Sequence, residues 1–198
     1  TWTEQTTAGS RMWGDITSSS DGTKLAAGVN GGYIYTSTDS GATWSTNSNS
    51  SGSRSWYGIT SSSDGTKLAA GVRGGYIYTS TDSGATWTER TLAGINHWED
   101  ITISSDGSKL AAADNSGYIY TSTNSGATWT AQTPAGSRSW KSITSSSDGT
   151  KLAANVGFSG SGYIYTTTLS FEDEDATPPT ITSVSSDKTN GTYGVGEV

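Results

Sequence analysis

The chain has 198 residues, no cysteine and a formal net charge of −7. The lack of cysteine excludes disulfides and thiolate metal sites, and this length is enough for one domain of ordinary size. Residues 1–169 carry 12 acidic and 10 basic side chains, whereas residues 170–198 carry 6 and 1, so the acidity belongs to the tail. The nearly neutral body lacks the basic footprint of a nucleic-acid-binding protein. The sequence has no apolar run of about 18 residues, the length that would predict a membrane-spanning helix.

Three markers recur along the chain at steps of 42 or 43 residues. The first is a tryptophan, at Trp13, Trp56, Trp98 and Trp140. The second is an Asp-Gly pair that begins at Asp21, Asp64, Asp106 and Asp148. The third is another tryptophan, at Trp2, Trp44, Trp87 and Trp129. A fixed period of this length indicates a repeat architecture.

Within the first unit the pattern predicts four short strands, at residues 13–18, 24–29, 33–38 and from 43 onward. Asp21-Gly22 supplies the positive φ values that a tight hairpin turn needs between the first two strands. Tyr33 to Tyr35 alternates aromatic and aliphatic side chains, so Ile34 takes the opposite face of the third strand. No segment of useful length has helical periodicity.

Four short strands in every unit of about 42 residues are typical of a β-propeller blade. The sequence therefore predicts an all-β propeller over residues 1–169 with four four-stranded repeats. The predicted repeats are residues 12–47, 55–90, 97–133, and 139–168 together with 1–6. A β-helix would have a shorter period, and an immunoglobulin-type sandwich would not repeat itself four times.

The two ends of the repeat region complement each other. Residues 1–6 (TWTEQT) align with the fourth strand of a blade, and the last unit lacks that strand. Pairing of residues 1–6 with residues 163–168 would close a ring and remove exposed sheet edges. Two rings satisfy this: one chain forms four blades, or a homodimer with exchanged end strands forms eight. A third alternative is a fragment of a longer array in which the matching phase is accidental.

The string S-x-D-x-G-x-T-W occurs at residues 37–44 and 80–87, and with Asn124 at the Asp position in residues 122–129. This string is identified as the Asp-box, or BNR repeat. The units resemble Asp-box propellers of the sialidase, sortilin and photosystem II assembly-factor kind over about residues 1–168. The resemblance implies a structural hairpin between the third and fourth strands of each blade. The residues that it assigns to this role are Asp39, Gly41, Trp44, Asp82, Gly84, Trp87, Asn124, Gly126 and Trp129. Asn124 keeps the hydrogen bonds without the charge, which argues against a metal site.

The remaining chain divides into two segments. Residues 170–178 are acidic and end in proline, and they are interpreted as a solvated linker rather than a calcium site. Residues 179–198 are similar to the opening of cadherin-like or Ig-like modules in bacterial surface proteins. That resemblance implies a truncated module and an extracellular or cell-surface location.

A candidate ligand-binding rim lies around the first strand of each unit. Arg11, Arg54 and Arg138 each precede the first tryptophan by two residues, and the third unit has Asn96 there with His97 beside it. The predicted rim residues are Arg11, Trp13, Arg54, Trp56, Tyr57, Asn96, His97, Trp98, Arg138 and Trp140. Such a rim suits an anionic or sugar ligand. The alternative is that each arginine stacks on or pairs with a neighbouring blade.

No catalytic set is recognised in the sequence. Sialidase chemistry needs three arginines on a carboxylate, a Tyr–Glu pair and an acid/base aspartate, but here the arginine positions follow the repeat. His97 has no partner residue for catalysis and is expected in an exposed loop. We therefore expect a non-catalytic binding or scaffolding propeller, with no cofactor or metal and with a protein or glycan ligand. The alternative is a glycan-binding or glycan-hydrolysing domain.

Overall fold

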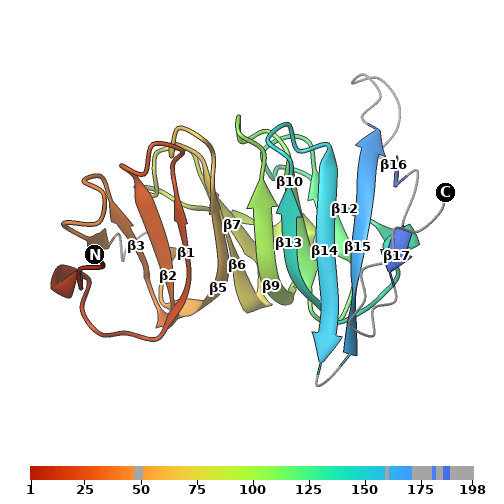
Figure 1. Ribbon diagram of the computed structural model, residues 1–198, viewed down its shortest axis with the longest axis horizontal. Helices are drawn as coiled ribbons and strands as arrows, with labels where there is room; N and C mark the ends of the chain where they lie inside the picture. The colour runs from red at the N-terminus through yellow and green to blue at the C-terminus, as the bar shows by residue number, and fades with distance from the viewer. Residues whose placement is uncertain (47–50, 159–160, 171–179, 182–184, 188–198) are drawn as a thin grey trace.

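The computed structural model describes residues 1–46, 51–158, 161–170, 180–181 and 185–187. Its regular structure is almost entirely antiparallel strand, so the predicted all-β class is confirmed. In Figure 1 the colour changes from red on one side of the molecule to blue on the other, so the groups of strands follow one another across the molecule in chain order. In the described residues, no helix is long and apolar enough to cross a membrane.

The strands form four repeats of antiparallel sheet, which we call blades 1 to 4. Blade 1 consists of β1 (Trp13–Ser18), β2 (Leu25–Gly32), β3 (Ile34–Ser37) and β4 (Ser45–Thr46). Blade 2 consists of β5 (Arg54–Ser61), β6 (Leu68–Gly75), β7 (Ile77–Ser80) and β8 (Thr88–Arg90). Blade 3 consists of β9 (Asn96–Ile103), β10 (Leu110–Asp114), β11 (Ile119–Ser122) and β12 (Thr130–Ala131). Blade 4 contains β13 (Trp140–Ser145), β14 (Lys151–Phe158) and β15 (Ser161–Ser170).

Short elements complete the described chain. Single-turn 3-10 helices precede the first strands of three blades, at η1 (Thr6–Ala8), η2 (Thr91–Ala93) and η3 (Thr133–Ala135). Two further strands, β16 (Thr180–Ile181) and β17 (Ser185–Asp187), pair with β15. The strands predicted for the first unit form within a few residues of their expected ends. The Asp-Gly hairpin forms as well, with Gly22 at φ 71°.

The hydrophobic core lies between successive blades. Each blade presents small residues and one isoleucine to the next blade, as Ala26 and Ile34 of blade 1 do toward Trp56 and Ile59 of blade 2. We call this the trailing face of a blade, and the Trp-bearing face that receives it the leading face. The same contact recurs between blades 2 and 3 and between blades 3 and 4. A Cβ atom on Gly28 would lie only 2.8 Å from the Trp56 Cβ, so the trailing face needs small residues.

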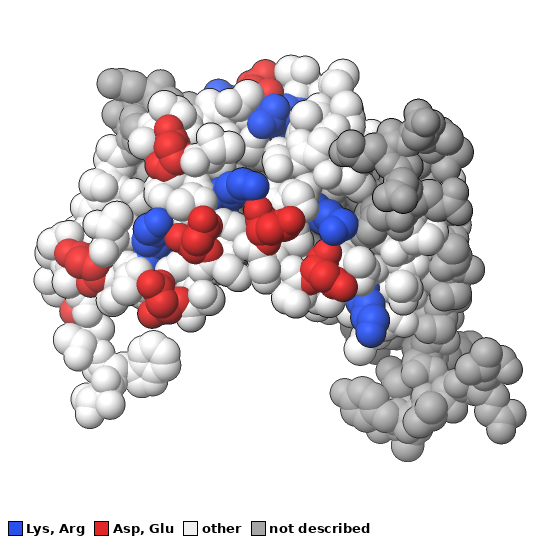
Figure 2. Space-filling model, turned by 90° about the horizontal axis from the view of Figure 1, so that it is seen from above, with Lys and Arg blue, Asp and Glu red and all other residues white. Residues whose placement is uncertain are grey.

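A second set of contacts joins the blades at the turn between their first two strands. Lysine ammonium groups donate to the Asp carbonyl of the next Asp-Gly turn: Lys24 to Asp64 (3.0 Å), Lys67 to Asp106 (2.7 Å) and Lys109 to Asp148 (3.1 Å). Serine N–H groups also donate to the carbonyl of the serine that directly precedes the next Asp-Gly turn: Ser20 to Ser63 (2.8 Å), Ser63 to Ser105 (2.9 Å) and Ser105 to Ser147 (2.7 Å). Figure 2 looks down on this surface and shows basic and acidic side chains interspersed along an arc.

The arc is open, and its two ends expose apolar residues. Trp13 and Ile16 on the leading face of blade 1 are 38% and 60% exposed. Ile164 on the trailing face of blade 4 is 52% exposed. A pocket of about 720 Å³ lies against the leading face of blade 1, between Trp13, Trp44 and the segment that contains Gln5. Among the described residues, the first and last blades therefore each lack a neighbouring blade on one side.

The expected closure of the ring within one chain is wrong in this structure. Residues 1–5 form no strand, and the Trp2 side chain is fully exposed. The outer edge of β15 pairs instead with β17, in the register Tyr165 with Ser186 and Thr166 with Ser185. In blade 1 the equivalent pairs join Tyr35 to Thr46 and Thr36 to Ser45 of the fourth strand. A segment of the tail thus occupies the fourth-strand position that residues 1–6 were predicted to fill.

The division of the tail remains a prediction. Most of the predicted linker at residues 170–178 and most of the predicted module at residues 179–198 lie outside the described residues. Within that part the structure describes only Ser170, β16 and β17.

Candidate functional site

The arginines of the predicted rim are held by contacts within their own blades. Arg11, Arg54 and Arg138 each stack their guanidinium group on a tyrosine of the third strand, 4.6, 4.6 and 4.8 Å from the ring centres of Tyr35, Tyr78 and Tyr165. Each Nε also donates to a carbonyl oxygen three residues earlier, at distances of 3.1, 3.2 and 3.0 Å. Asn96 makes the same bond in blade 3, to Ala93 at 3.2 Å. These side chains therefore hold the segment that precedes each first strand against its blade.

The tryptophans of the predicted rim belong to the core between blades. Trp56, Trp98 and Trp140 are 1%, 0% and 0% exposed, so a ligand at the rim cannot reach them. All four rim tryptophans meet a tyrosine of the same blade edge to face, at centroid distances of 5.4 Å (Trp13–Tyr35), 5.3 Å (Trp56–Tyr78), 5.1 Å (Trp98–Tyr120) and 5.1 Å (Trp140–Tyr165). Trp13 alone of the four is partly exposed, because no described blade covers the leading face of blade 1.

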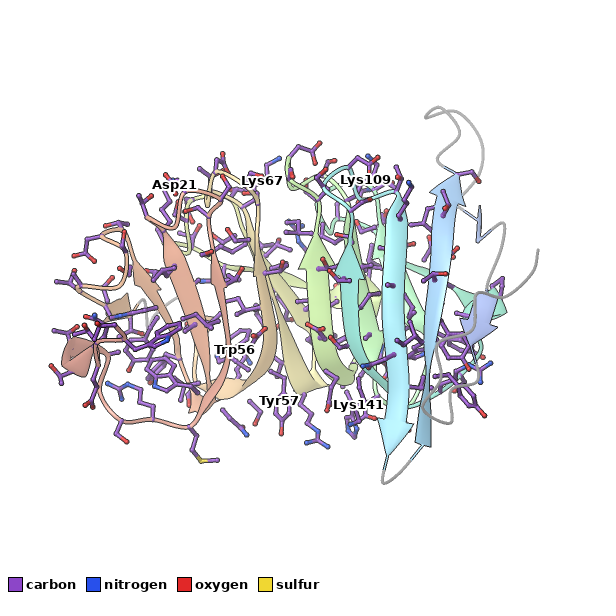
Figure 3. The ribbon with its side chains drawn as sticks, in the orientation of Figure 1. Asp21, Trp56, Tyr57, Lys67, Lys109 and Lys141 are labelled. Atoms are coloured by element: carbon purple, nitrogen blue, oxygen red, sulfur yellow. The ribbon has the colours of Figure 1, made fainter. Side chains whose placement is uncertain are left out.

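A group of polar side chains lies at the same end of the first strands. Tyr57, Glu99 and Lys141 each follow the core tryptophan of their blade by one residue. Figure 3 shows Tyr57 and Lys141 at the end of the strands opposite to Asp21, Lys67 and Lys109. Arg73 and Asn115 join them from the end of the second strand in blades 2 and 3. We call these five residues the rim cluster.

Direct contacts divide the rim cluster into two groups: Arg73 with Tyr57 in blade 2, and Glu99 with Asn115 and Lys141 across blades 3 and 4. The Arg73 guanidinium donates to the Tyr57 hydroxyl at 2.8 Å and lies 5.0 Å from its ring centre. The Glu99 carboxylate accepts from Lys141 Nζ at 2.9 Å and from Asn115 Nδ2 at 3.2 Å. The Tyr57 hydrogen bond, then the charges of Tyr57 and Glu99, raise the pKa of Arg73. The cluster is therefore charged and partly solvated, and each of its two groups is held together by its own contacts.

The rim predicted from the sequence includes Tyr57 but not the other four members of the cluster. The available signal was variation: the position after the core tryptophan reads Gly14, Tyr57, Glu99 and Lys141 in otherwise similar units. At the end of the second strand, Arg73 differs from the equivalent residues Asn30 and Asn115. His97 lies near the cluster, since it pairs with Arg73 between β9 and β6. It is exposed as expected, but it lies in strand β9 and not in a loop.

Two carboxylates on the first strands join neighbouring blades. Asp15 accepts the backbone N–H of Ile59 at 2.9 Å, and Asp100 accepts that of Ile143 at 2.8 Å. Each also accepts the N–H of the residue that follows it, at 2.8 Å. Burial raises the pKa of Asp100, against the lowering effect of its hydrogen bonds. Both carboxylates thus serve the contact between blades.

The S-x-D-x-G-x-T-W segments form three equivalent turns. The Asp39 carboxylate accepts the Thr43 N–H at 2.8 Å, and Trp44 Nε1 donates to the Gly41 carbonyl at 2.9 Å. The second and third turns repeat both bonds, through Asp82 (2.8 Å) with Trp87 (3.1 Å), and Asn124 (2.8 Å) with Trp129 (3.0 Å). Gly41, Gly84 and Gly126 have φ of 88°, 87° and 81° and are buried in the turns. The predicted hydrogen bonding is present in all three.

No group of three or more potential metal ligands occurs among the described residues. The acidic run at residues 172–175, which the sequence analysis weighed as a calcium site, lies outside them.

Comparison with known proteins bears on the fold. No protein-family model and no curated protein matches the chain. Among solved structures it is similar to a GH74 enzyme of Niastella koreensis, with a TM-score of 0.68 and 20% identity over 91% of this chain and 30% of that one. YCF48 bound to a D1 peptide gives a TM-score of 0.61 and 16% identity over 91% and 55% of the two chains. A putative TolB of Agrobacterium tumefaciens gives 0.59 and 21% over 80% and 58%.

These solved structures are β-propellers, and the chain spans well under two thirds of each of them. At such identities the likeness concerns the fold alone. Together with the four repeated blades and their Trp-centred interfaces, it shows that the chain has a β-propeller fold.

Proposed function

We propose that the chain is a non-catalytic binding propeller that recognises a protein partner through the rim cluster. The observation that carries this proposal is where the repeats differ. Residues 31–44 and 74–87 are identical letter for letter, which leaves these parts of blades 1 and 2 no means of distinguishing partners. The rim cluster, in contrast, contains four side chains that differ from their equivalents in the other units: Tyr57, Arg73, Glu99 and Lys141. They lie at one end of the first strands, in two contact groups.

The chemistry of the cluster suits a peptide with an acidic or other acceptor group. Arg73 is exposed, and a guanidinium has five N–H donors, of which Tyr57 takes one. Lys141 and Glu99 neutralise each other in part, so Arg73 carries the charge available to a ligand. Tyr57 adds an aromatic surface of the kind enriched at protein interfaces. Propellers of similar fold include one solved with a D1 peptide and one in a nidogen/laminin complex.

The S-x-D-x-G-x-T-W turns are, in this proposal, Asp-box hairpins with a structural role. The hydrogen bonds of the Asp39, Asp82 and Asn124 side chains all close on the turn itself, so asparagine supports one turn as aspartate supports the others. The resemblance of the tail to surface-protein modules supports a secreted or cell-surface setting. Fractionation of the source cells with an antibody to this chain tests that setting.

Peptide selection tests the binding function. Peptides are selected by phage display on the immobilised chain, and their affinities are measured for the parent chain, Arg73→Ala and Asn30→Ala. Asn30 occupies the position of Arg73 in blade 1, outside the cluster, and is the matched control. We expect Arg73→Ala to weaken binding by about tenfold or more, as loss of a charged anchor does, and Asn30→Ala to leave it unchanged. Equal affinity for all three chains would refute the role of the rim cluster.

Glycan hydrolysis is the alternative, and the similarity to GH74 enzymes gives it a defined substrate, since one such structure is described as a xyloglucanase. The carboxylates that it would need are Asp15 and Asp100, whose oxygens accept backbone N–H groups. We expect no release of reducing sugar from xyloglucan and no sialidase activity. Release by the parent chain that Asp100→Asn abolishes would favour the enzyme over the binding propeller.

A further inference from the structure

The internal interfaces show what normally covers a leading face. Where a preceding blade is present, the core tryptophans are 0–1% exposed and the isoleucines Ile59, Ile101 and Ile143 are 3–4% exposed. On blade 1 the equivalent residues Trp13 and Ile16 are 38% and 60% exposed. The 720 Å³ pocket beside them occupies the place that the trailing face of a preceding blade takes elsewhere.

The other end of the arc has the matching surface. Ile34, Ile77 and Ile119 project from trailing faces into the next blade and are 2%, 0% and 5% exposed. Their equivalent on blade 4, Ile164, is 52% exposed. A second hollow, of about 580 Å³, lies there among Ser145, Ala153 and Thr166. Among the described residues, no blade covers the trailing face of blade 4, and the leading face of blade 1 is of the kind that covers trailing faces within the chain. Likewise no described blade covers the leading face of blade 1, and the trailing face of blade 4 is of the kind that covers leading faces within the chain.

The polar groups at the two ends also complement each other. Between blades, a lysine and a serine N–H donate forward to the carbonyls of the next Asp-Gly turn and of the serine before it. At the end of the series, Lys151 and the Ser147 N–H have no such acceptor among the described residues. At its beginning, the carbonyls of Ser20 and Asp21 receive no such donor among them. Lys151 and the Ser147 N–H are thus the same kinds of donor, in the same arrangement, as those that bind the equivalents of Ser20 and Asp21 between blades of the chain.

We propose that the leading face of blade 1 binds the trailing face of blade 4 of a second copy of this chain. Two copies then join at both ends, related by a two-fold axis, in a closed ring of eight blades. Heterologous contacts of this kind form a ring when the rotation closes, and eight blades lie within the usual range for propellers. Ile16 of one copy packs on the small residues of the other, and Lys151 donates to the partner's Asp-Gly turn. The strand exchange considered from the sequence is not required, because β17 already occupies the fourth-strand position of blade 4.

One residue departs from the internal pattern and sets the strength of this contact. Asn155 stands at the position of Gly28, Gly71 and Ala113, where space next to the facing tryptophan is smallest. Its amide must turn away from Trp13 of the second copy, which costs packing energy. The contact between copies is therefore weaker than the contacts within the chain, and the dimer dissociates on dilution.

Sedimentation equilibrium over a concentration series of the full chain tests the proposal. We expect a reversible monomer–dimer equilibrium, weakened by about tenfold or more in Ile16→Asp, which buries a charge, and tightened by about tenfold in Asn155→Ala, which relieves overpacking. Ile95→Asp is the matched control, since Ile95 is 63% exposed but lies outside both faces. Circular dichroism confirms that each variant folds.

Three results would overturn the proposal. The first is a monomer at every concentration in both the parent chain and Asn155→Ala. The second is an equal effect of Ile16→Asp and Ile95→Asp, which would move the interface elsewhere. The third is growth beyond the dimer, which would show that the contact does not close. Each is distinguishable from failure of the binding function, because Arg73 lies outside both faces.

Discussion

At the scale of single residues, short-range hydrogen bonds to aspartate organise the turns of every blade. Asp21, Asp39 and Asp148 accept bonds from hydroxyl and N–H groups within a few residues of themselves. The serine or threonine hydroxyls, followed by the backbone N–H groups, lower the pKa of each carboxyl to about 2. The sequence predicted these turns because all their partners lie within the local motif. Asn124 shows that the amide of asparagine supports the same geometry at neutral pH.

These carboxylates make stability depend on pH in the acid range. Their pKa values are lower in the folded than in the unfolded chain, where aspartate titrates near 3.9, so the charged form favours folding. This stabilisation is complete above about pH 4 and is lost as the pH falls toward 2. We expect the melting temperature, followed by circular dichroism, to drop across that window. The triple variant Asp21→Asn, Asp39→Asn, Asp148→Asn should melt at a lower temperature than the parent chain near pH 7, because it lacks the charged acceptors, and its melting temperature should drop less below pH 4. An equally steep drop in both would assign the acid sensitivity to other groups.

At the scale of elements, the sequence predicted the strands and the hairpins within a blade but not the contacts between blades. Strand positions follow from local alternation and turn residues, which one unit contains in full. The link of Lys141 to Glu99 and the bond from Ile143 to Asp100 join residues that are 42 and 43 positions apart. Such pairs depend on how two blades are placed, which no single unit encodes. The partner of β15 was mistaken for a related reason: β17 follows no repeat pattern.

The role of β17 leads to a prediction about the two ends of the chain. Removal of residues 171–198 takes away the strand that covers the outer edge of β15, whereas residues 1–4 make no strand pairs. In the Ile16→Asp background, which keeps the chain monomeric, we expect the C-terminal deletion to lower the melting temperature by several degrees. Deletion of residues 1–4 should leave it nearly unchanged. The reverse order of effects would show that the N-terminal segment, as first expected from the sequence, completes the last blade.

At the scale of the whole molecule, the repeats predict the number of blades in the chain but not the form of the ring. That form depends on the rotation from blade to blade and on whether the end faces are covered. Both depend on packing at the trailing face, where a few atoms determine how closely blades approach. Gly28 and Gly71 have no side chain there and the facing tryptophan packs directly on them, whereas Ala113 adds one methyl group and Asn155 an amide side chain. Only the last of these side chains is exposed.

A matched pair of substitutions tests whether the trailing face carries this constraint only where a blade covers it. A Cβ atom on Gly71 would lie 2.7 Å from the Trp98 Cβ, so Gly71→Asn forces blades 2 and 3 apart. We expect it to lower the free energy of unfolding by about 1–3 kcal/mol, the usual cost of overpacking, in urea melts of the Ile16→Asp monomer. Asn155→Gly places the opposite change at the equivalent exposed position and should alter the stability of that monomer by less than about 1 kcal/mol, the loss in backbone entropy that glycine causes in a strand. The contrary result would be an equally small change in the free energy of unfolding for Gly71→Asn and Asn155→Gly. It would mean that the interfaces between blades accept side chains that the close Trp–Gly contacts should exclude. The packing at the open ends of the arc would then not differ from the packing inside it.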